Sequence, residues 1–249
     1  MQEYFFVSAG VQSIVRHYKK KYGESLYRFD QYVAIHINDT HPALVIPELM
    51  RIFMDEEGLS WQAAWDITVR TVAYTNHTIL PEALEKWSIP MFKDLLPRIY
   101  LIIEEINNRW LREVRRLYPG DENKARDVAI LWDGQIHMAH LSVLGSHSVN
   151  GVAEIHSQIL KDSTLHQFYT CFPHRFSNKT NGISHRRWLI EANPKLASLI
   201  DDTIGDKWRK TPSRLADLMA YKDDASFKEA LAKVKTERKE WLARYIRDK

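Results

Sequence analysis

Apolar residues recur at helical spacing over several long stretches of the chain. Between Tyr4 and Tyr22 they gather on one side of a helix that carries basic residues near its end and is followed by Gly23. The same spacing predicts helices over Leu44–Met54 and Met91–Leu117, a helix beginning at the N-cap residue Ser60, and an amphipathic helix over Ala225–Ile246.

A second pattern predicts a small number of strands. Tyr32–Ile37 is a short and nearly continuous apolar run, which is typical of a strand buried on both faces of a parallel sheet. Val128–Trp132 and Gln135–His140 flank Asp133-Gly134, which favours a hairpin. Gly151–Lys161 is expected to form a helix capped by Asn150. The chain is therefore predicted to be α/β, rich in helices and with few strands.

The character of the sequence changes near Asn181, after which only helices are expected. We place a domain boundary there, dividing the chain into residues 1–181 and residues 182–249. The net charge is +3, of which +6 falls between Lys207 and Lys249, leaving −3 for the rest. These basic residues alternate with apolar ones at helical spacing and lack an aromatic stacking platform, which indicates a solvated helix face and no nucleic-acid partner.

Cysteine content and hydropathy indicate the compartment. The single Cys171 allows no internal disulfide, which fits a reducing environment. The chain has no run of about 20 apolar residues that could cross a membrane, and its first residues do not resemble a signal peptide. We therefore expect a cytoplasmic protein that does not insert into membranes.

The Asn38-Asp-Thr-His-Pro42 motif directly follows the predicted buried strand and precedes a helix. Ligands of open α/β sheets bind at the carboxyl ends of the strands, and helix N-termini offer free N–H groups. These polar side chains could bind a ligand rich in hydroxyl groups. Spacing alone fits equally a helix cap formed by Asp39 and Thr40, with His41 an ordinary surface residue.

Two further polar segments are candidate ligand loops. Gly145–Gly151 has glycines at both ends, which would allow close approach of the backbone to a ligand, and contains His147. Asn178–Gly182 is followed by Arg186-Arg187-Trp188, where an arginine pair at a helix start could hold a phosphate. A flexible connection and a helix with exposed charges are the respective structural alternatives.

Other chemistries find little support in the residues. The spacing of His137, His140 and His147 fits no zinc pattern, so no metal site is predicted. Phosphate-binding and serine-hydrolase motifs are absent. No carboxylate pair of a glycosidase stands out. Glu82, Glu85 and Glu154 are candidates only in the sense that any glutamate is. The polar turn Thr75–Pro81 is interpreted as the capped entrance of a helix.

Five segments together resemble the α-glucan phosphorylases, the enzymes that act on glycogen, maltodextrin or starch. These segments are QEYFFVSAG, NDTHPALVIPELMR, YTNHTILPEALEKW, MAHLSVLGSHSVNGVAEIHS and NKTNGISHRRWL, in the order and approximate spacing seen in that family. The resemblance covers essentially the whole chain. It implies a GT-B-type fold, with two Rossmann-like domains facing each other across a cleft. Residues 1–181 would be the C-terminal half of the first domain, and residues 182–249 the helical start of the second.

The resemblance also implies an activity and its partners. The family is a glycosyltransferase family that cleaves terminal α-1,4 bonds of a glucan with inorganic phosphate, giving α-glucose 1-phosphate, and its members are expected to be homodimers. Its cofactor, pyridoxal 5'-phosphate, is attached to a lysine of the second domain, and the cofactor phosphate works with the substrate phosphate as acid and base. An oxocarbenium-like sugar would then be stabilised by surrounding dipoles rather than by a carboxylate pair.

Carried over by motif, five residues acquire expected roles. His147 matches a histidine that contacts the glucosyl unit near its 6-hydroxyl, within a segment expected to be mobile, and is the expected catalytic residue. Asn181 matches an asparagine on the same side of that sugar, and Asp39 and His41 match a polar pair lining the pocket. Trp188 matches a residue near the cofactor, with less support. His185 departs from the family pattern, where proline is common.

Two family segments that serve phosphate and the cofactor do not occur in these 249 residues, namely the H-E-Y-K segment and the G-T-G-N-M-K stretch. We therefore expect an internal fragment, inactive alone, that lacks the cofactor lysine. A truncated module that only binds glucan or contacts a subunit is the alternative. A sugar-nucleotide glycosyltransferase of the same architecture has less support, since the motifs resemble phosphorylases.

Overall fold

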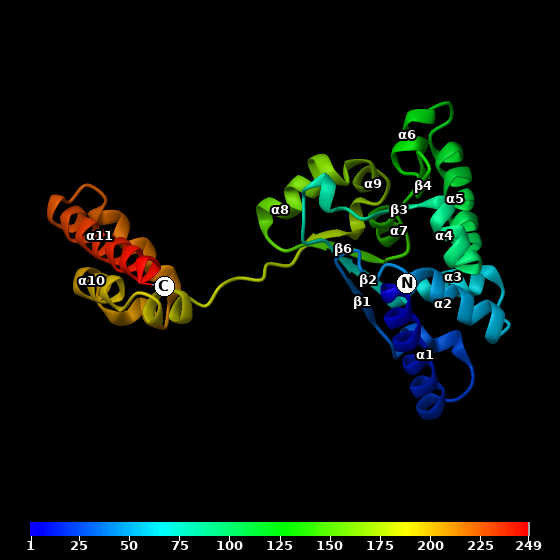
Figure 1. Cartoon of the computed structure of the whole chain (residues 1–249), viewed down its shortest axis with the longest axis horizontal. Coiled ribbons are helices and arrows are strands. Elements are labelled where there is room, and N and C mark those ends of the chain that lie inside the picture. The colour runs from blue at the N-terminus through cyan, green and yellow to red at the C-terminus, as the bar shows by residue number, and fades with distance from the viewer. Residues whose placement is uncertain (249) are drawn as a thin grey trace. The chain divides into compact units, whose positions relative to one another are not determined.

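The computed structural model describes residues 1–248 and divides the chain into two compact units, Met1–Asn181 and a second that begins at Gly182 (Figure 1). The first contains a parallel sheet and its surrounding helices, and the second is helical throughout its described residues. This helix-rich α/β architecture with few strands confirms the predicted fold class.

The first unit alternates helices with short strands along the chain. Its helices and strands are α1 (Gln2–Tyr22), η1 (Leu26–Gln31), β1 (Ile35–Asn38), α2 (Val45–Arg51), η2 (Ile52–Glu56), α3 (Trp61–Thr71), β2 (Val72–Thr75), η3 (Pro81–Ala83), β3 (Lys86–Ser88), α4 (Ile89–Leu95), α5 (Pro97–Leu117), α6 (Glu122–Asp127), β4 (Leu131–Trp132), β5 (Gln135–His137), α7 (Met138–Leu144), β6 (Ser148–Gly151), α8 (Glu154–Ile159), η4 (Leu160–Thr164), α9 (His166–Cys171), η5 (Pro173–Arg175) and β7 (Phe176–Asn178).

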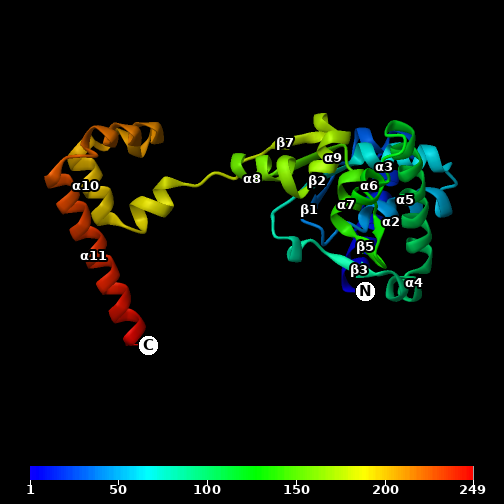
Figure 2. The same cartoon turned by 90° about the horizontal axis from the view of Figure 1, so that it is seen from above.

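Strands β1, β2, β6 and β7 form the parallel sheet, in that spatial order. Because every neighbouring pair in this sheet is parallel, the carboxyl ends of all four strands lie at one edge. Ile37, Tyr74 and Val149 are fully buried at facing positions of neighbouring strands. Helix α2 packs against α3 and α5, as Figure 2 shows from a second direction.

Several local predictions need correction. The predicted strand Tyr32–Ile37 begins later, at Ile35, because η1 and a turn occupy the preceding residues. The single helix over Met91–Leu117 is two helices, α4 and α5, because Leu96 (φ −139°, ψ 59°) leaves the helical conformation before Pro97, which begins α5.

The Gly145–Gly151 segment is wrongly predicted as a mobile ligand loop. Its residues Ser148–Gly151 are strand β6, which lies between β2 and β7. Asn150, the expected helix cap, is a buried strand residue, and α8 begins only after Ala153. The glycines serve packing: a Cβ on Gly145 would lie 2.5 Å from Ile46 Cδ1, and one on Gly151 would lie 2.6 Å from Ser157 Oγ.

The expected hairpin and the cap of α3 are both present, but the strands of the hairpin are shorter than predicted: β4 is only Leu131–Trp132, and β5 ends at His137 because α7 begins at Met138. Strands β4 and β5 pair antiparallel around Asp133 and Gly134, whose φ angles of 51° and 68° suit a two-residue turn. Together with β3 they make a separate three-stranded sheet. At the start of α3, Ser60 Oγ accepts a hydrogen bond of 3.3 Å from the Ala63 N–H.

Ser60→Ala is expected to lower the free energy of unfolding of the first unit by about 1 kcal/mol, since it removes this cap from an exposed position without creating a cavity. Urea denaturation followed by circular dichroism measures the change. Ser60→Asp restores an acceptor and should recover stability. Equal stability of Ser60→Ala and the native chain would show that the cap contributes nothing.

The second unit has its own small core. Its described elements are η6 (Arg186–Glu191), α10 (Pro194–Ile204), η7 (Asp206–Arg209), η8 (Pro212–Tyr221) and α11 (Ala225–Arg247). Trp208 is fully buried with Ala197 and Ile200, and its indole Nε1 donates to Asp201 Oδ1 at 3.0 Å. The predicted amphipathic helix is present as α11, although it leaves Trp241, Leu242 and Ile246 exposed.

Candidate active site

Polar side chains follow the ends of all four parallel strands. We call this set the polar edge and define it as residues 38–41, 76–78, 150–152 and 178–181. Backbone hydrogen bonds extend the ladder beyond the strands: the Asp39 N–H donates to the Thr75 carbonyl at 2.9 Å, and the Asn181 N–H donates to the Val152 carbonyl at 3.2 Å. The sheet therefore positions these segments beside one another.

Side-chain hydrogen bonds connect the first three strands across the polar edge. His77 Nε2 lies 2.5 Å from Asn38 Oδ1, which joins the segments after β2 and β1. Thr75 Oγ1 donates to Asn150 Oδ1 at 2.7 Å, which joins β2 to β6. Since the Asn38 oxygen can only accept, the His77 Nε2 carries the proton in this bond.

Asn76 fixes the turn that carries His77. It is fully buried, its Oδ1 accepts from the Thr78 N–H at 2.9 Å, and its Nδ2 donates to the Tyr74 hydroxyl at 3.1 Å. The ring of His156 lies 3.0 Å from the same Oδ1, while its other nitrogen accepts from Val152. Both the oxygen and the nitrogen of the buried Asn76 amide are therefore hydrogen-bonded. These bonds fix the turn, and the side chain of His77 lies exposed on it.

Asp39 adopts a backbone conformation that non-glycine residues seldom take. Its φ is +63°, in the left-handed region, where aspartate is one of the better tolerated residues. Its Oδ1 accepts a hydrogen bond of 2.9 Å from the Thr40 N–H. Backbone conformations of this kind are frequent at functional sites, so Asp39 remains a candidate site residue.

His41 lies beside the carboxyl groups of Glu3 and Glu85. Its Nδ1 lies 3.5 Å from Glu85 Oε1 and 3.7 Å from Glu3 Oε1, and Thr40 Oγ1 donates to Glu85 Oε2 at 2.6 Å. Burial first, then a hydrogen bond with Glu85 and the charge of Glu85, raise the pKa of Glu3 to about 7, against the opposing charge of His41 and the terminal amine.

Glu3, His41 and Glu85 could also hold a cation, because their ligand atoms lie within 4.8 Å of one another. The sequence prediction of no metal site stays a prediction.

Glu3→Gln is expected to flatten the pH dependence of stability between about pH 4.5 and pH 7. In that window the folded chain retains a proton on Glu3 that the unfolded chain has released, so stability falls as pH rises. At pH 8 the variant should be more stable than the native chain, by about 1 kcal/mol after allowing for solvent screening. Urea unfolding at pH 4.5, 6 and 8 tests this. If the free energy of unfolding changed with pH in the same way for both chains, the raised pKa of Glu3 would be contradicted.

His147 does not lie with the other predicted site residues. Its N–H donates to the Val72 carbonyl at 3.0 Å, and its ring Nδ1 lies 3.2 Å from the Val69 carbonyl. Val72 is the first residue of β2, so His147 is at the amino edge of the sheet, opposite Asp39. The expectation of a histidine beside the sugar-facing residues is therefore not met by His147.

Asp39, His41 and Asn181 do share the polar edge, at its two ends. Asp39 and His41 follow β1, and Asn181 follows β7, with two strands between. At about 4.8 Å per strand spacing, the two ends are roughly 14 Å apart. His77, which follows β2, lies between them and was overlooked because its turn was interpreted only as a helix entrance. The rule applied to Asp39, that ligands gather where a buried strand ends, would have selected it.

The residues present do not complete a site for pyridoxal phosphate. Trp188 is 63% exposed in the second unit, with the Arg187 guanidinium 5.5 Å from its ring centroid. Lys124, a buried lysine of the first unit, donates through Nζ to Gln167 and Thr170, so its amine is engaged. We derive no chemical step through the cofactor from the described residues.

Taken together, a parallel sheet and a polar edge with exposed hydrogen-bonding side chains define an α/β protein whose candidate ligand site is at the carboxyl ends of its strands. The sequence model of the family described as carbohydrate phosphorylase matches residues 1–249. The chain belongs to this family.

Relatives with curated names extend this result. The chain is 54% identical over 245 residues to a glycogen phosphorylase of Bacillus subtilis (strain 168), a match that covers 98% of this chain and 31% of the relative. It is 48% identical over 255 residues to the muscle forms of glycogen phosphorylase of Bos taurus and Homo sapiens, covering 98% of this chain and 30% of each. The chain thus spans about a third of the length of these relatives. None of the helices in residues 1–248 is long and apolar enough to cross a bilayer.

Proposed function

We propose that the polar edge is the sugar-facing wall of an enzyme that cleaves terminal α-1,4 bonds of a glucan with inorganic phosphate, releasing α-glucose 1-phosphate. The observation that carries the proposal is the hydrogen-bonded array after β1, β2, β6 and β7, in a chain of the carbohydrate phosphorylase family. The names of the relatives supply the reaction and the substrate class.

Within this proposal, four residues contact the terminal glucosyl unit or the adjoining chain. His77 offers its remaining ring nitrogen, Nδ1, as an acceptor, Asn181 offers its amide group at an exposed position, and Asp39 and His41 line the side of the site after β1. His77 takes the role that motif matching gave to His147. Neutral hydroxyl groups are recognised by such fixed donors and acceptors without a charged catalytic pair.

The remaining parts of the proposal rest on the family alone. Residues 1–181 would be the C-terminal half of an N-terminal domain, and residues 182–249 the helical start of the cofactor domain, with Trp188 near the cofactor. Family membership implies pyridoxal phosphate in general. The enzyme would be a homodimer in the cytoplasm, and residues 1–249 alone would bind glucan but turn over none.

Two measurements test the proposal. Titration of the chain with maltoheptaose should give saturable binding, and the full product of the reading frame that encodes it should release glucose 1-phosphate from maltoheptaose and phosphate. A full product that binds the oligosaccharide without releasing glucose 1-phosphate would favour a glucan-binding module. The exposed Trp241, Leu242 and Ile246 of α11 give the contact-module alternative its support. Absence of both binding and release would overturn the proposal.

A further inference from the structure

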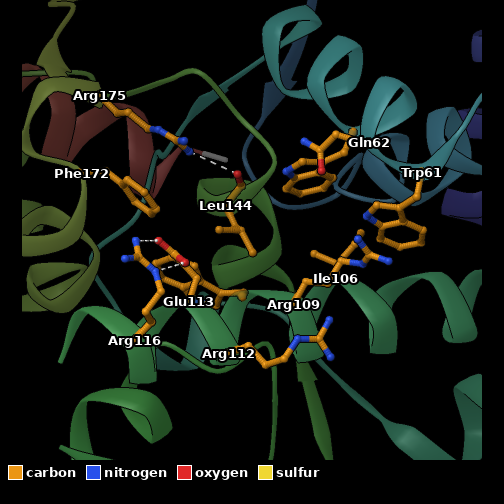
Figure 3. Close-up of a pocket in the computed structure, with 12 residues that line it drawn as sticks. Trp61, Gln62, Ile106, Arg109, Arg112, Glu113, Arg116, Leu144, Phe172 and Arg175 are labelled. Carbon is orange, nitrogen blue, oxygen red and sulfur yellow. Dashed lines mark hydrogen bonds and ion pairs between the residues drawn. The ribbon is translucent and has the colours of Figure 1, made fainter. Parts of the chain in front are cut away.

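A groove of about 590 Å³ lies on the first unit, between α3 and α5. Figure 3 shows Trp61 and Gln62 on the α3 side, Arg109, Arg112 and Arg116 on α5, and Phe172 and Arg175 at one end. We call it the arginine groove. Four arginines and one glutamate line it, a formal charge of +3. Its size is within the range of small-molecule sites, about 300–1,000 Å³.

Arg175 is a half-buried cation that has no carboxylate partner among the described residues. Its Nη1 donates to three backbone carbonyls, those of Val143 at 3.3 Å, Leu144 at 3.2 Å and Ser146 at 2.9 Å. Burial alone lowers the pKa of this guanidinium, with no neighbouring charge opposing it. These three carbonyls fix one side of the Arg175 guanidinium group. Its other two nitrogens, Nε and Nη2, form no hydrogen bond within residues 1–248. A held but uncompensated guanidinium is suited to a bound anion.

The other arginines leave positive charge in excess. Arg116 is paired with Glu113 by two hydrogen bonds, of 2.9 Å and 2.7 Å. Arg109 and Arg112 share a single carboxylate, Glu105, at 2.6 Å and 3.9 Å. With Arg175 unpaired, the groove lacks about two negative charges, which is the charge of a phosphate monoester near neutral pH.

Aromatic side chains supply a flat apolar surface beside these cations. Phe172 stacks on the ring of Trp110, with centroids 5.1 Å apart, and the Arg175 guanidinium lies 4.1 Å from the Phe172 centroid. On the α3 side, Arg109 lies 4.7 Å from the Trp61 centroid. Rings and guanidinium planes arranged in this way stack flat ligand groups.

We propose that the arginine groove binds a phosphate monoester that carries a flat ring, with the phosphate on the Arg175 nitrogens that form no hydrogen bond and the ring against the aromatic side chains of Trp61 and Phe172. The excess positive charge favours an anion, and the three carbonyls fix the guanidinium group of Arg175 that would bind it. A volume of about 590 Å³ leaves room for a ring beside the phosphate.

Isothermal titration of the chain with phenyl phosphate tests this proposal. We expect a dissociation constant of about 0.1–1 mM, weakened by added salt. Inorganic phosphate should compete with phenyl phosphate, and phenol should bind more weakly than either. Arg175→Lys retains a charge and a donor for the carbonyls but loses the fork, and it should weaken binding about 10-fold.

A matched pair of variants on α5 separates a site from general charge attraction. Arg112→Gln removes a groove arginine and should weaken binding about 3-fold, whereas Arg115→Gln, which breaks a pair with Glu122 outside the groove, should leave it unchanged. Circular dichroism confirms that each variant is folded. Equal losses in both α5 variants, no saturable binding of phenyl phosphate by the folded chain, or binding of phenyl phosphate that inorganic phosphate does not affect would each overturn the proposal.

Discussion

His77→Ala is expected to weaken maltoheptaose binding to the chain by about 10-fold, which corresponds to one lost hydrogen bond of about 1.4 kcal/mol. In the full product of the reading frame, kcat/KM for phosphorolysis should fall by about 100-fold or more, because a hydrogen-bonding group held at the reacting sugar acts most strongly in the transition state. Stability should change little, since the His77 side chain is exposed and the turn below it is held by Asn76.

His147→Ala is the matched control for this experiment. His147 is also an exposed histidine beside a strand of the same sheet, but it lies at the amino edge, with its ring near the Val69 carbonyl. Its removal should leave sugar binding and turnover unchanged. The opposite outcome, a large loss for His147→Ala and none for His77→Ala, would restore the role that motif matching assigned to His147.

Gly145→Ala is expected to destabilise the first unit by about 2–3 kcal/mol, the usual cost of overpacking a core. The added Cβ would lie 2.5 Å from Ile46 Cδ1 and 2.8 Å from two further atoms of the same side chain, and Ile46 is fully buried, so it has no open space to enter. Chemical denaturation measures the loss as a shift of the midpoint.

Gly10→Ala is a control for which the free energy of unfolding should rise instead of fall. Gly10 is in α1, is exposed, and has nothing within 4 Å of an added Cβ, so alanine should stabilise the helix by up to about 1 kcal/mol. A double variant, Gly145→Ala with Ile46→Val, should recover part of the lost stability because it removes one of the clashing atoms. Full stability of Gly145→Ala alone would show that the segment before β6 is loosely packed.

Helices were predicted well because their apolar positions recur over many turns. The stripe of Ile99, Ile103, Ile106 and Val114 identified α5, and each of these residues is buried. Its start was misplaced because the spacing continues across Leu96, and only the restriction imposed by Pro97 on the preceding residue marks the break. The sequence does contain that signal.

Strands of the parallel sheet were harder to predict because they are short. Strand β2 has four residues and follows α3 without a loop, so Val72–Thr75 continues the helical pattern and was overlooked. Strand β6 contains serine, asparagine and glycine, so its composition is polar although most of it is buried. The buried Asn150 side chain accepts a hydrogen bond from Thr75, and Gly151 has no side chain that would clash with Ser157. Composition alone suggests a loop at such a place.

The candidate site was therefore predicted in part. Asp39 and His41 followed from a physical rule, because a buried strand precedes them. Contacts between distant segments, such as Thr40 with Glu85 or His77 with Asn38, depend on the register of the sheet and leave no trace in local spacing. The position of His147 depends on which end of β6 it occupies, and that could not be known while β6 was taken for a loop.

The most direct test of the polar edge as a sugar site is nuclear magnetic resonance of the isotope-labelled chain titrated with maltoheptaose. Amide shifts at residues 38–41, 76–78 and 178–181 should move together and saturate with one affinity, while the amides around His147 and in the arginine groove stay in place. Saturable changes confined to the amino edge, with the polar edge unmoved, would contradict the account.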